Sequence, residues 1–151
     1  MRVVVQRVKQ AKVIADGKLS GAIGPGLLVF LGIEQRDTQE DATWLAEKIP
    51  VIRCFEDEQG KMNRSLQDKN YEIMVISQFT LYGSLRKGTR PSFNRAALPD
   101  SAIPLYEFFV TKLEQLCDKP VATGVFGAYM EIDAANDGPV TLIIDTKDKD
   151  L

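Results

Sequence analysis

The chain has 151 residues, 44% hydrophobic and 26% charged, which is the size and composition of one soluble globular domain. It contains no histidine, and this excludes Ser-His-Asp and Cys-His catalysis, imidazole acid–base chemistry and nearly all zinc sites. A net charge of −2 and a pI near 5.2 argue against binding to long nucleic-acid tracts or anionic membranes.

Neither a membrane span nor a secretion signal is visible. The longest uninterrupted apolar run, Leu27 to Leu31, is far shorter than the roughly 20 residues that cross a bilayer. Arg2 and Arg7 interrupt any signal-peptide core, so we expect a cytoplasmic protein. Cys54 and Cys117 lie too far apart for a CxxC motif, and we expect both to be buried and inert.

The first third of the chain predicts short strands. Val3–Val8 and Lys12–Ala15 are rich in β-branched residues. Asp16-Gly17 is a type I′ hairpin signal that leads into Lys18–Ile23. Leu27–Ile33 is apolar on both sides of the pleat, which is typical of a central strand.

An amphipathic helix is expected next. Thr38 with Asp41 three residues on predicts its cap, and Pro50 ends it before a strand at Val51–Phe55. The apolar residues on one helical face are Ala42, Leu45, Ala46 and Ile49.

The second half predicts one more buried strand at Tyr71–Ile76 and the longest helix at Ser101–Cys117. Closing strands are expected at Val121–Phe126, Tyr129–Ile132 and Val140–Ile144. About eight strands and two good helices, mostly strand after strand, favour an α+β fold with antiparallel pairing over a parallel doubly wound sheet.

Charge is unevenly distributed. No acidic residue lies between Glu72 and Asp100. This interval is interpreted either as a local positive surface that suits a few phosphates or as an ordinary solvated loop. A second acid-free interval, Met1 to Ala15, favours a protected edge strand. The cations of the first interval are Arg86, Lys87, Arg90 and Arg95.

Two segments offer polar groups at strand boundaries. Ser77–Gly83 follows a buried strand with hydroxyls, an amide and backbone N–H groups, the material of an oxyanion hole, although such residues can also simply continue a strand. Asn136–Pro139 is a turn by composition, and a cis Gly138-Pro139 bond is the rarer alternative.

Four blocks together resemble the D-aminoacyl-tRNA deacylase family, and they stand in the family's order. These are SQFTLYG at Ser77–Gly83, RPSF at Arg90–Phe93, FGAYM at Phe126–Met130 and NDGPVT at Asn136–Thr141. Similar stretches at Val3–Val8, Gly21–Ile33 and Lys61–Asn63 extend the resemblance over essentially the whole chain.

The resemblance implies hydrolysis of the ester between a D-amino acid and the terminal adenosine of tRNA, and it leaves mischarged glycine open as a second substrate. It implies one domain over residues 1–151, with a polar tail at 146–151, built of mostly antiparallel sheets curled into a barrel-like ββα sandwich with two main helices. It further implies a homodimer with a cross-subunit active site and neither metal nor cofactor.

Residue roles follow from the same resemblance. A catalytic floor is implied at Ser77, Gln78, Phe79 and Thr80. Substrate contacts are implied at Leu81, Phe126, Met130 and a cis Gly138-Pro139 pair that enters the partner's site. The candidates to hold the acceptor end of tRNA come from the acid-free interval and not from the resemblance, and they are Arg86, Lys87 and Arg90. One departure is Tyr129, where the family often has Asp.

The implied chemistry agrees with the absence of histidine. Backbone N–H groups around Phe79 and Thr80 would hold the oxyanion, and the ribose hydroxyl of the substrate would orient or deprotonate the attacking water. Thr80 as a covalent nucleophile is the rival mechanism, but no His and no Lys near it in sequence could activate its hydroxyl. A non-catalytic nucleic-acid-binding module and an inactive dimeric scaffold are the competing functions.

Overall fold

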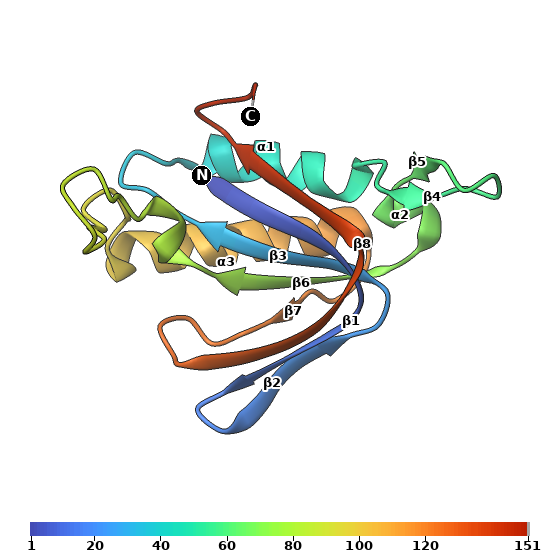
Figure 1. The fold of residues 1–151 in the computed structure, drawn as a ribbon, viewed down its shortest axis with the longest axis horizontal. Coiled ribbons are helices and arrows are strands. Elements are labelled where there is room, and N and C mark those ends of the chain that lie inside the picture. Colours follow the sequence, from blue (N-terminus) through green and yellow to red (C-terminus); the bar gives the residue numbers. More distant parts are fainter. Residues whose placement is uncertain (151) are drawn as a thin grey trace.

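The structure is a computed structural model that describes residues 1–150, and it folds as a curled mixed sheet with helices on one side (Figure 1). The strands are β1 (Arg2–Ala15), β2 (Lys18–Ile23), β3 (Gly26–Gly32), β4 (Phe55–Glu56), β5 (Met62–Arg64), β6 (Glu72–Ser77), β7 (Ala122–Thr123) and β8 (Met130–Asp145). The helices are α1 (Gln39–Lys48), α2 (Leu66–Lys69) and α3 (Pro99–Cys117), with short 3-10 helices η1 (Ile49–Val51) and η2 (Phe79–Tyr82).

The long strand β1 is the centre of the sheet. Its first half pairs antiparallel with β3, from Arg2 opposite Gly32 to Val8 opposite Gly26, and its second half pairs antiparallel with β2. The other edge of β1 pairs antiparallel with β8 along nearly its whole length. Beyond β3 the sheet continues through β6 and β7 with parallel pairing. The α+β class with mainly antiparallel pairing and two main helices is therefore confirmed.

The two ends of the sheet, β2 and β7, approach each other and nearly close a barrel. The hydroxyl of Ser20 donates to the carbonyl oxygen of Thr123 at 2.8 Å. A Cβ on Gly21 would lie 3.0 Å from the same oxygen, so this approach requires a glycine. The seam is joined by a side chain and not by a backbone ladder.

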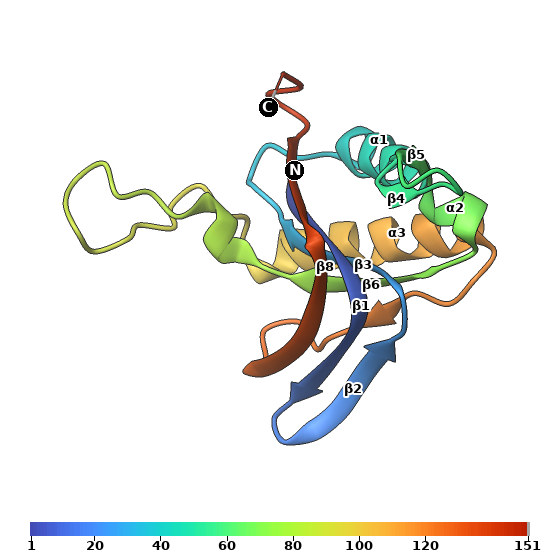
Figure 2. The same cartoon turned by 45° about the vertical axis from the view of Figure 1, so that its right-hand side comes forward.

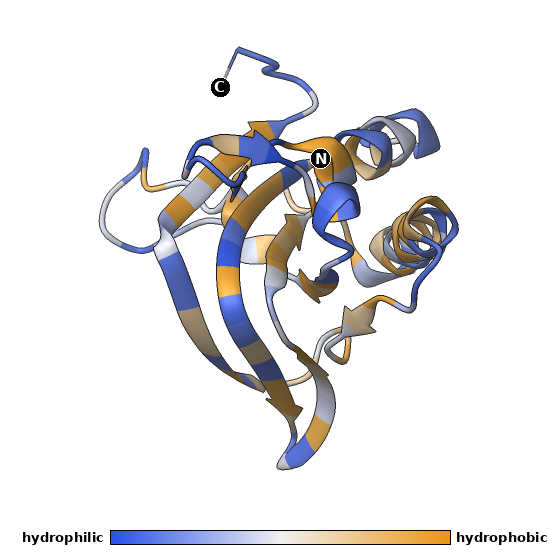
Figure 3. Ribbon diagram, turned by 90° about the vertical axis from the view of Figure 1, so that its right-hand side faces the viewer, coloured by the Kyte–Doolittle hydropathy of each residue, from blue (hydrophilic) through white to orange (hydrophobic). Residues whose placement is uncertain are grey.

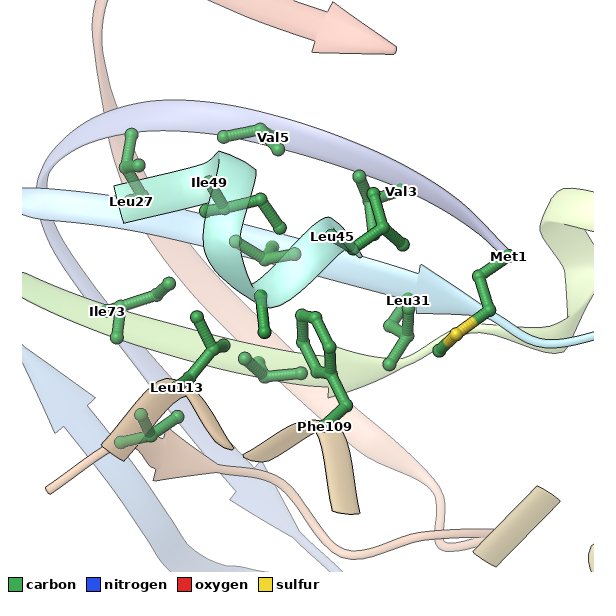
Figure 4. Packing of buried hydrophobic residues seen from close by; sticks show 14 of the residues in the cluster. Met1, Val3, Val5, Leu27, Leu31, Leu45, Ile49, Ile73, Phe109 and Leu113 are labelled. Carbon is green, nitrogen blue, oxygen red and sulfur yellow. The ribbon is translucent and has the colours of Figure 1, made fainter. Parts of the chain in front are cut away.

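Two hydrophobic clusters lie on opposite faces of β3 and β6, and this explains why these strands are apolar throughout. On one face Phe109 and Leu113 of α3 pack with Leu45 of α1 and Ile49 of η1 against the sheet (Figure 4). The opposite face fills the barrel. Its buried members are Val8, Ala11, Val13, Ile23, Leu28, Met74 and Ile76.

The outer part of the barrel shows the alternation expected of strands that are buried on one face. In Figure 3 the two long strands β1 and β8 carry alternating bands of hydrophilic and hydrophobic residues. Val3 and Val5 of β1 are buried with the helices, whereas Val13 is buried inside the barrel. β1 therefore changes its buried face near its middle, where its register with β8 shifts on both sides of Val8.

Local signals at two boundaries are confirmed. Asp16 and Gly17 both have positive φ, 48° and 79°, as a type I′ turn requires. The carboxylate of Asp41 accepts from the Thr38 N–H at 2.9 Å and caps α1. Among the described residues no helix is long and apolar enough to cross a membrane.

Several expected elements differ from the structure. The two expected strands within residues 3–15 are one continuous strand, and the strand expected at Val51–Phe55 is wrong, since η1 occupies Ile49–Val51 and pairing begins only at Phe55. Of Val121–Phe126 only residues 122–123 are paired, because the chain leaves the sheet at Gly124 to form a loop.

The expected turn at Asn136–Pro139 is also wrong. It lies inside β8, where the register irregularity opposite β1 accommodates it without ending the strand. Of the expected polar tail, Thr146 is buried and its N–H donates to the Met1 carbonyl oxygen at 2.9 Å. Leu151 lies outside the described residues.

Candidate functional site

One cavity of about 280 Å³, here called the main cavity, opens at the end of the barrel beside η2. It brings together five of the residues expected in the site, namely Ser77, Gln78, Phe79, Phe126 and Met130. The other residues that line it are Leu31, Ile33, Ile76, Ala97, Ala102, Gly127, Ala128, Tyr129 and Ile132. The space is mostly apolar, with the polar groups gathered where β6 ends.

The floor of the main cavity is formed where β6 changes into η2. The Gln78 N–H donates to the Leu31 carbonyl oxygen at 2.7 Å, which prolongs the parallel ladder by one bond. The Leu81 N–H donates to the Gln78 carbonyl oxygen at 3.2 Å and closes the first 3-10 turn. A helix leaves its first N–H groups without partners, and within residues 1–150 the N–H groups of Phe79 and Thr80 have no acceptor.

The side chains of Gln78, Phe79 and Thr80 surround the start of η2. The side-chain amide of Gln78 donates to the hydroxyl of Thr80. Phe79 is 56% exposed, and its ring meets that of Phe93 edge to face with centroids 5.1 Å apart. Thr80 and Leu81, both expected in the site, do not line the main cavity.

The opposite wall is the loop between β7 and β8. The ring of Phe126 packs edge to face on Tyr106 at 5.8 Å, and the Tyr106 hydroxyl donates to the Val75 carbonyl oxygen at 2.9 Å. A Cβ on Gly124 would collide with the sulfur of Met130, so this glycine lets Met130 turn into the cavity. The wall is therefore tied through α3 to β6, the strand that also carries the floor.

The side chain of Tyr129 lies at the mouth of the main cavity, and the residue is 75% exposed. Its carbonyl oxygen accepts from the Asp16 N–H at 3.1 Å, which ties the loop to the β1–β2 hairpin. An exposed aromatic ring thus stands where the resembling family often has Asp.

Gly138 and Pro139 do not line the main cavity of their own chain. The peptide bond between them is cis, and both residues are exposed. Arg7 fixes the preceding residue, because its Nε donates to the Asp137 carbonyl oxygen at 3.0 Å and lies 3.3 Å from the Asp137 carboxylate. The Arg7 Nη1 also donates to the Cys54 carbonyl oxygen at 2.7 Å.

Arg7 was missed as a functional residue by the sequence reasoning, which assigned residues 1–15 to a protected edge strand. That interpretation is wrong, because β1 is the central strand and Arg7 is only 6% exposed. The position of Arg7 in the strand pattern indicates that its side chain is buried. It continues the inward alternation of Val3 and Val5, and a charged residue at a core position needs specific partners.

The three cations expected to bind RNA stand on a projecting arm, residues 84–92, that extends beyond the body of the protein (Figure 2). Ser84 and Ser92 exchange two backbone hydrogen bonds, of 2.8 and 3.0 Å, and close its base. Arg86, Lys87 and Arg90 are exposed, and none forms an ion pair within residues 1–150.

The titratable groups near the floor are not candidates for acid–base catalysis. Tyr82 lies between two guanidinium groups, with Arg2 at 5.2 Å and Arg95 at 5.3 Å from its ring, and burial raises the pKa of its hydroxyl far above the ordinary value. Burial likewise raises the pKa values of Cys54, which is buried, and Cys117, which is half-buried. The site offers hydrogen-bond donors and an apolar space.

Comparison with known proteins gives consistent results. A family model described as D-Tyr-tRNA(Tyr) deacylase matches residues 4–145. A D-aminoacyl-tRNA deacylase of Parabacteroides distasonis is 55% identical over 150 residues, which cover 99% of this chain and 100% of the relative. A protein of the same name from Thermus aquaticus is 56% identical over 149 residues, with 99% and 97% covered.

Two solved structures are similar as well. One described as a c-Myc DNA unwinding element binding protein is 41% identical with a TM-score of 0.90, and the match covers 97% of this chain and 99% of that one. A probable eukaryotic D-amino acid tRNA deacylase has a TM-score of 0.80 at 20% identity, covering 95% and 97% of the two chains, and this supports the fold alone.

Proposed function

The chain belongs to the D-aminoacyl-tRNA deacylase family and hydrolyses D-aminoacyl-tRNA, and we propose that it does so with backbone donors and a hydroxyl of its own substrate. The observation that carries the mechanism is the pair of N–H groups at Phe79 and Thr80, which have no acceptor within residues 1–150. Phe79 lines the main cavity, and Thr80 follows it in the first turn of η2. No histidine occurs in the sequence to act as a general base.

In this mechanism the aminoacyl group enters the main cavity and its ester carbonyl faces η2. As water attacks, negative charge develops on the carbonyl oxygen, and the N–H groups of Phe79 and Thr80 donate to it. Each such donor is worth about 10² to 10³ in rate where it has been measured in other hydrolases. The ribose hydroxyl next to the ester orients the water and accepts a proton from it while it passes its own proton to the leaving ester oxygen. The C–O bond of the ester then breaks, and the free amino acid and a tRNA with its terminal hydroxyl restored are released.

The rival mechanism, attack by the Thr80 hydroxyl, lacks a base. The only side chain that is hydrogen-bonded to this hydroxyl within the described residues is the amide of Gln78. An amide does not accept a proton at neutral pH in either orientation, so the hydroxyl stays protonated and weakly nucleophilic.

A homodimer would complete the site. Within residues 1–150, the named strand that pairs with β8 is β1, so the outer edge of β8 has no strand beside it over residues 130–144. Leu142 and Ile143 of β8 are 37% and 47% exposed. Such an edge is a template for association. In a two-fold dimer the exposed Gly138–Pro139 segment of each copy would enter the main cavity of the other.

That segment would also set the chirality of the substrate. Backbone carbonyl oxygens from the partner would accept from the α-amino group and occupy the space that an L side chain needs. Excluding the L side chain requires no specific contact with the D side chain, so this kind of selection suits an enzyme that accepts many D-amino acids. The projecting arm, through Arg86, Lys87 and Arg90, would hold phosphates of the tRNA acceptor end.

Incubation with D-Tyr-tRNA and L-Tyr-tRNA, with release of free tyrosine as the readout, tests the proposal. We expect release from the D substrate and little from the L substrate. A second function has one observation in its favour, the 41% identity to a protein described as binding a DNA unwinding element. Tight binding of DNA or RNA without release of tyrosine would support that function and overturn the mechanism.

A further inference from the structure

Three ion pairs around the start of β1 have the cation facing solvent and the carboxylate buried, whereas the pair of the Met1 ammonium group with Asp37 is buried on both sides. The exposed side-chain fractions are 60% for Arg95 against 10% for Glu34, 43% for Lys147 against 10% for Asp41, and 29% for Arg2 against 4% for Asp145. A molecule that approaches this surface therefore contacts guanidinium and ammonium groups, although the protein is acidic overall.

A cavity of about 560 Å³, here called the basic cavity, lies in this surface. One more cation belongs to it. Arg36 is exposed and forms no ion pair with any residue that the structure describes. Every residue that lines the cavity is polar: Glu34, Gln35, Arg36, Asn94, Arg95 and Lys147.

The walls of the basic cavity are held in place before any ligand arrives. The Arg95 Nε and Nη2 donate to the Glu34 carboxylate at 3.2 and 2.8 Å, and the guanidinium lies over the Tyr82 ring. The side-chain amide of Gln35 donates to the Asn94 carbonyl oxygen at 2.9 Å. Fixed donors lose little entropy on binding, which favours recognition of a charged group.

The basic cavity adjoins the main cavity through a two-stranded ribbon formed by residues 33–36 and 94–97. The Ala97 N–H donates to the Ile33 carbonyl oxygen at 2.9 Å, and both residues line the main cavity. The Gln35 N–H donates to the Arg95 carbonyl oxygen at 3.1 Å, and both residues line the basic cavity. Three residues of extended chain span at most about 10 Å, so the two cavities are neighbours.

We infer that the basic cavity binds backbone phosphates of the RNA nucleotides that precede the terminal adenosine. The inference rests on the proposed function, which places the aminoacyl group inside the main cavity, so that the adenosine joined to it would lie outside, next to the mouth of the cavity. Arginine recognises phosphate through its planar array of N–H donors, and phosphate contacts fix the register of a nucleic acid without reading its sequence. Arg36 and Arg95 supply those donors, and Lys147 adds charge.

The test uses two substrates, full-length D-Tyr-tRNA and 3′-D-tyrosyl-adenosine, which has the reacting ester but no phosphate. The variant is Arg36→Gln, because the described part of the chain holds no ion-pair partner of Arg36 whose loss would disturb the fold. The matched control is Lys61→Gln, an exposed cation on the β4–β5 hairpin, which lies at the opposite end of the molecule from the arm (Figure 1).

We expect Arg36→Gln to raise KM for D-Tyr-tRNA roughly five- to tenfold with kcat unchanged, as loss of one charge-assisted hydrogen bond does. The slope of log affinity against log salt should decrease in magnitude by about 1. Hydrolysis of 3′-D-tyrosyl-adenosine should be the same as in wild type.

Two results would overturn the inference. One is an Arg36→Gln variant that behaves like Lys61→Gln on D-Tyr-tRNA. The other is an equal loss on both substrates, which would mean that Arg36 acts on the main cavity and not on phosphate. Failure of the wild-type protein to cleave either substrate would instead contradict the proposed function, so the two failures are distinguishable.

Discussion

Arg7 Nε donates to the backbone carbonyl oxygen of Asp137 at 3.0 Å, so one residue of β1 holds the segment of β8 that leads into Gly138. The same guanidinium donates to the Cys54 carbonyl oxygen at 2.7 Å and connects β8 to the chain after η1. Three elements far apart in sequence thus meet at one buried cation, at the point where β1 changes its buried face.

Replacement of this cation should affect both stability and turnover. Hydrogen bonds to charged groups contribute about 1.5 to 3 kcal/mol each, so Arg7→Met should lower the free energy of unfolding by roughly 2 kcal/mol or more. Arg7→Lys keeps the charge but loses the planar array of N–H donors. Its free energy of unfolding should lie between those of Arg7→Met and the wild type. Urea unfolding measures the first effect and D-Tyr-tRNA hydrolysis the second. Wild-type stability in Arg7→Met would contradict the assigned hydrogen bonds.

Thr80→Ala separates the two mechanisms. The substitution removes the hydroxyl but keeps the backbone N–H, so we expect substantial turnover to remain. A D-Tyr-tRNA whose terminal nucleotide is 2′-deoxyadenosine should be cleaved poorly by the wild-type enzyme, because it lacks the hydroxyl that activates water. An inactive Thr80→Ala together with rapid cleavage of the deoxy substrate would make Thr80 the nucleophile.

Gly138→Ala should reduce hydrolysis of D-Tyr-tRNA at least tenfold, an effect of about 1.4 kcal/mol on the transition state. Gly138 has φ of +131°, and an added Cβ would lie 2.8 Å from the Val140 nitrogen, so the segment has to move. The control is Gly60→Ala, which also has positive φ, +76°, but open space around the added Cβ. Equal activity of the two variants would exclude a role for the backbone geometry at Gly138.

Sedimentation equilibrium should give a mass of about twice 16.8 kDa for the wild-type protein. Ile143→Arg places a charge on the exposed part of β8 and should yield a monomer that no longer hydrolyses D-Tyr-tRNA. Leu19→Arg, on β2, is the control, since Leu19 is 66% exposed and lies off the unpaired edge of β8. A stable, fully active monomer would refute both the dimer and the cross-subunit site.

Acid stability should depend on Asp41. Burial alone would raise its pKa, but hydrogen bonds from Lys147, Thr146 and the Thr38 N–H outweigh burial and hold the pKa well below the usual value of 3.8. A carboxylate with a depressed folded-state pKa stabilises the fold above its unfolded-state pKa and loses that contribution as the pH falls toward the folded value.

Asp41→Asn should therefore lower the free energy of unfolding at pH 7 by roughly 1 kcal/mol, and the difference from wild type should shrink below about pH 4. Glu107→Gln is the control and should leave the curve unchanged, because Glu107 is exposed on α3 and forms no ion pair within residues 1–150. Thermal unfolding at pH 3 to 7 provides the measurement. A difference that grows on acidification would mean that the ion pair with Lys147 is not what lowers the pKa.

The sequence predicts best those helices and strands whose pattern of apolar residues matches the way they pack in the fold. Leu27–Ile33 and Tyr71–Ile76 are apolar on both faces because helices cover one and the barrel interior the other. α3 was expected from its spacing and occupies Pro99–Cys117. At Asn136–Pro139 local and tertiary signals disagree, since turn residues are held in a strand by pairing with β1 on both sides of an irregularity.

The roles of the site residues stay predictions, and the sequence does not show how the chain brings these residues together. Ser77 is a candidate from its place after a buried strand and Met130 from the family resemblance, and the fold brings β6 and the β7–β8 loop to one cavity. Net charge counts exposed and buried groups equally. It therefore does not show that three ion pairs at the start of β1 expose the cation and bury the carboxylate. For the same reason an overall charge of −2 is compatible with a surface that attracts RNA.

The seam between β2 and β7 is the side of the barrel where we expect local opening to cost the least free energy. Strands that meet through the Ser20 hydroxyl, without a backbone ladder, separate at a lower free energy than the paired strands around them. β7 leads directly into the loop that carries Phe126 and Met130, so opening of this seam would displace one wall of the main cavity. The floor at the end of β6 stays within the sheet. We therefore expect D side chains of different size to be accommodated at this wall, while the ester is held at the floor.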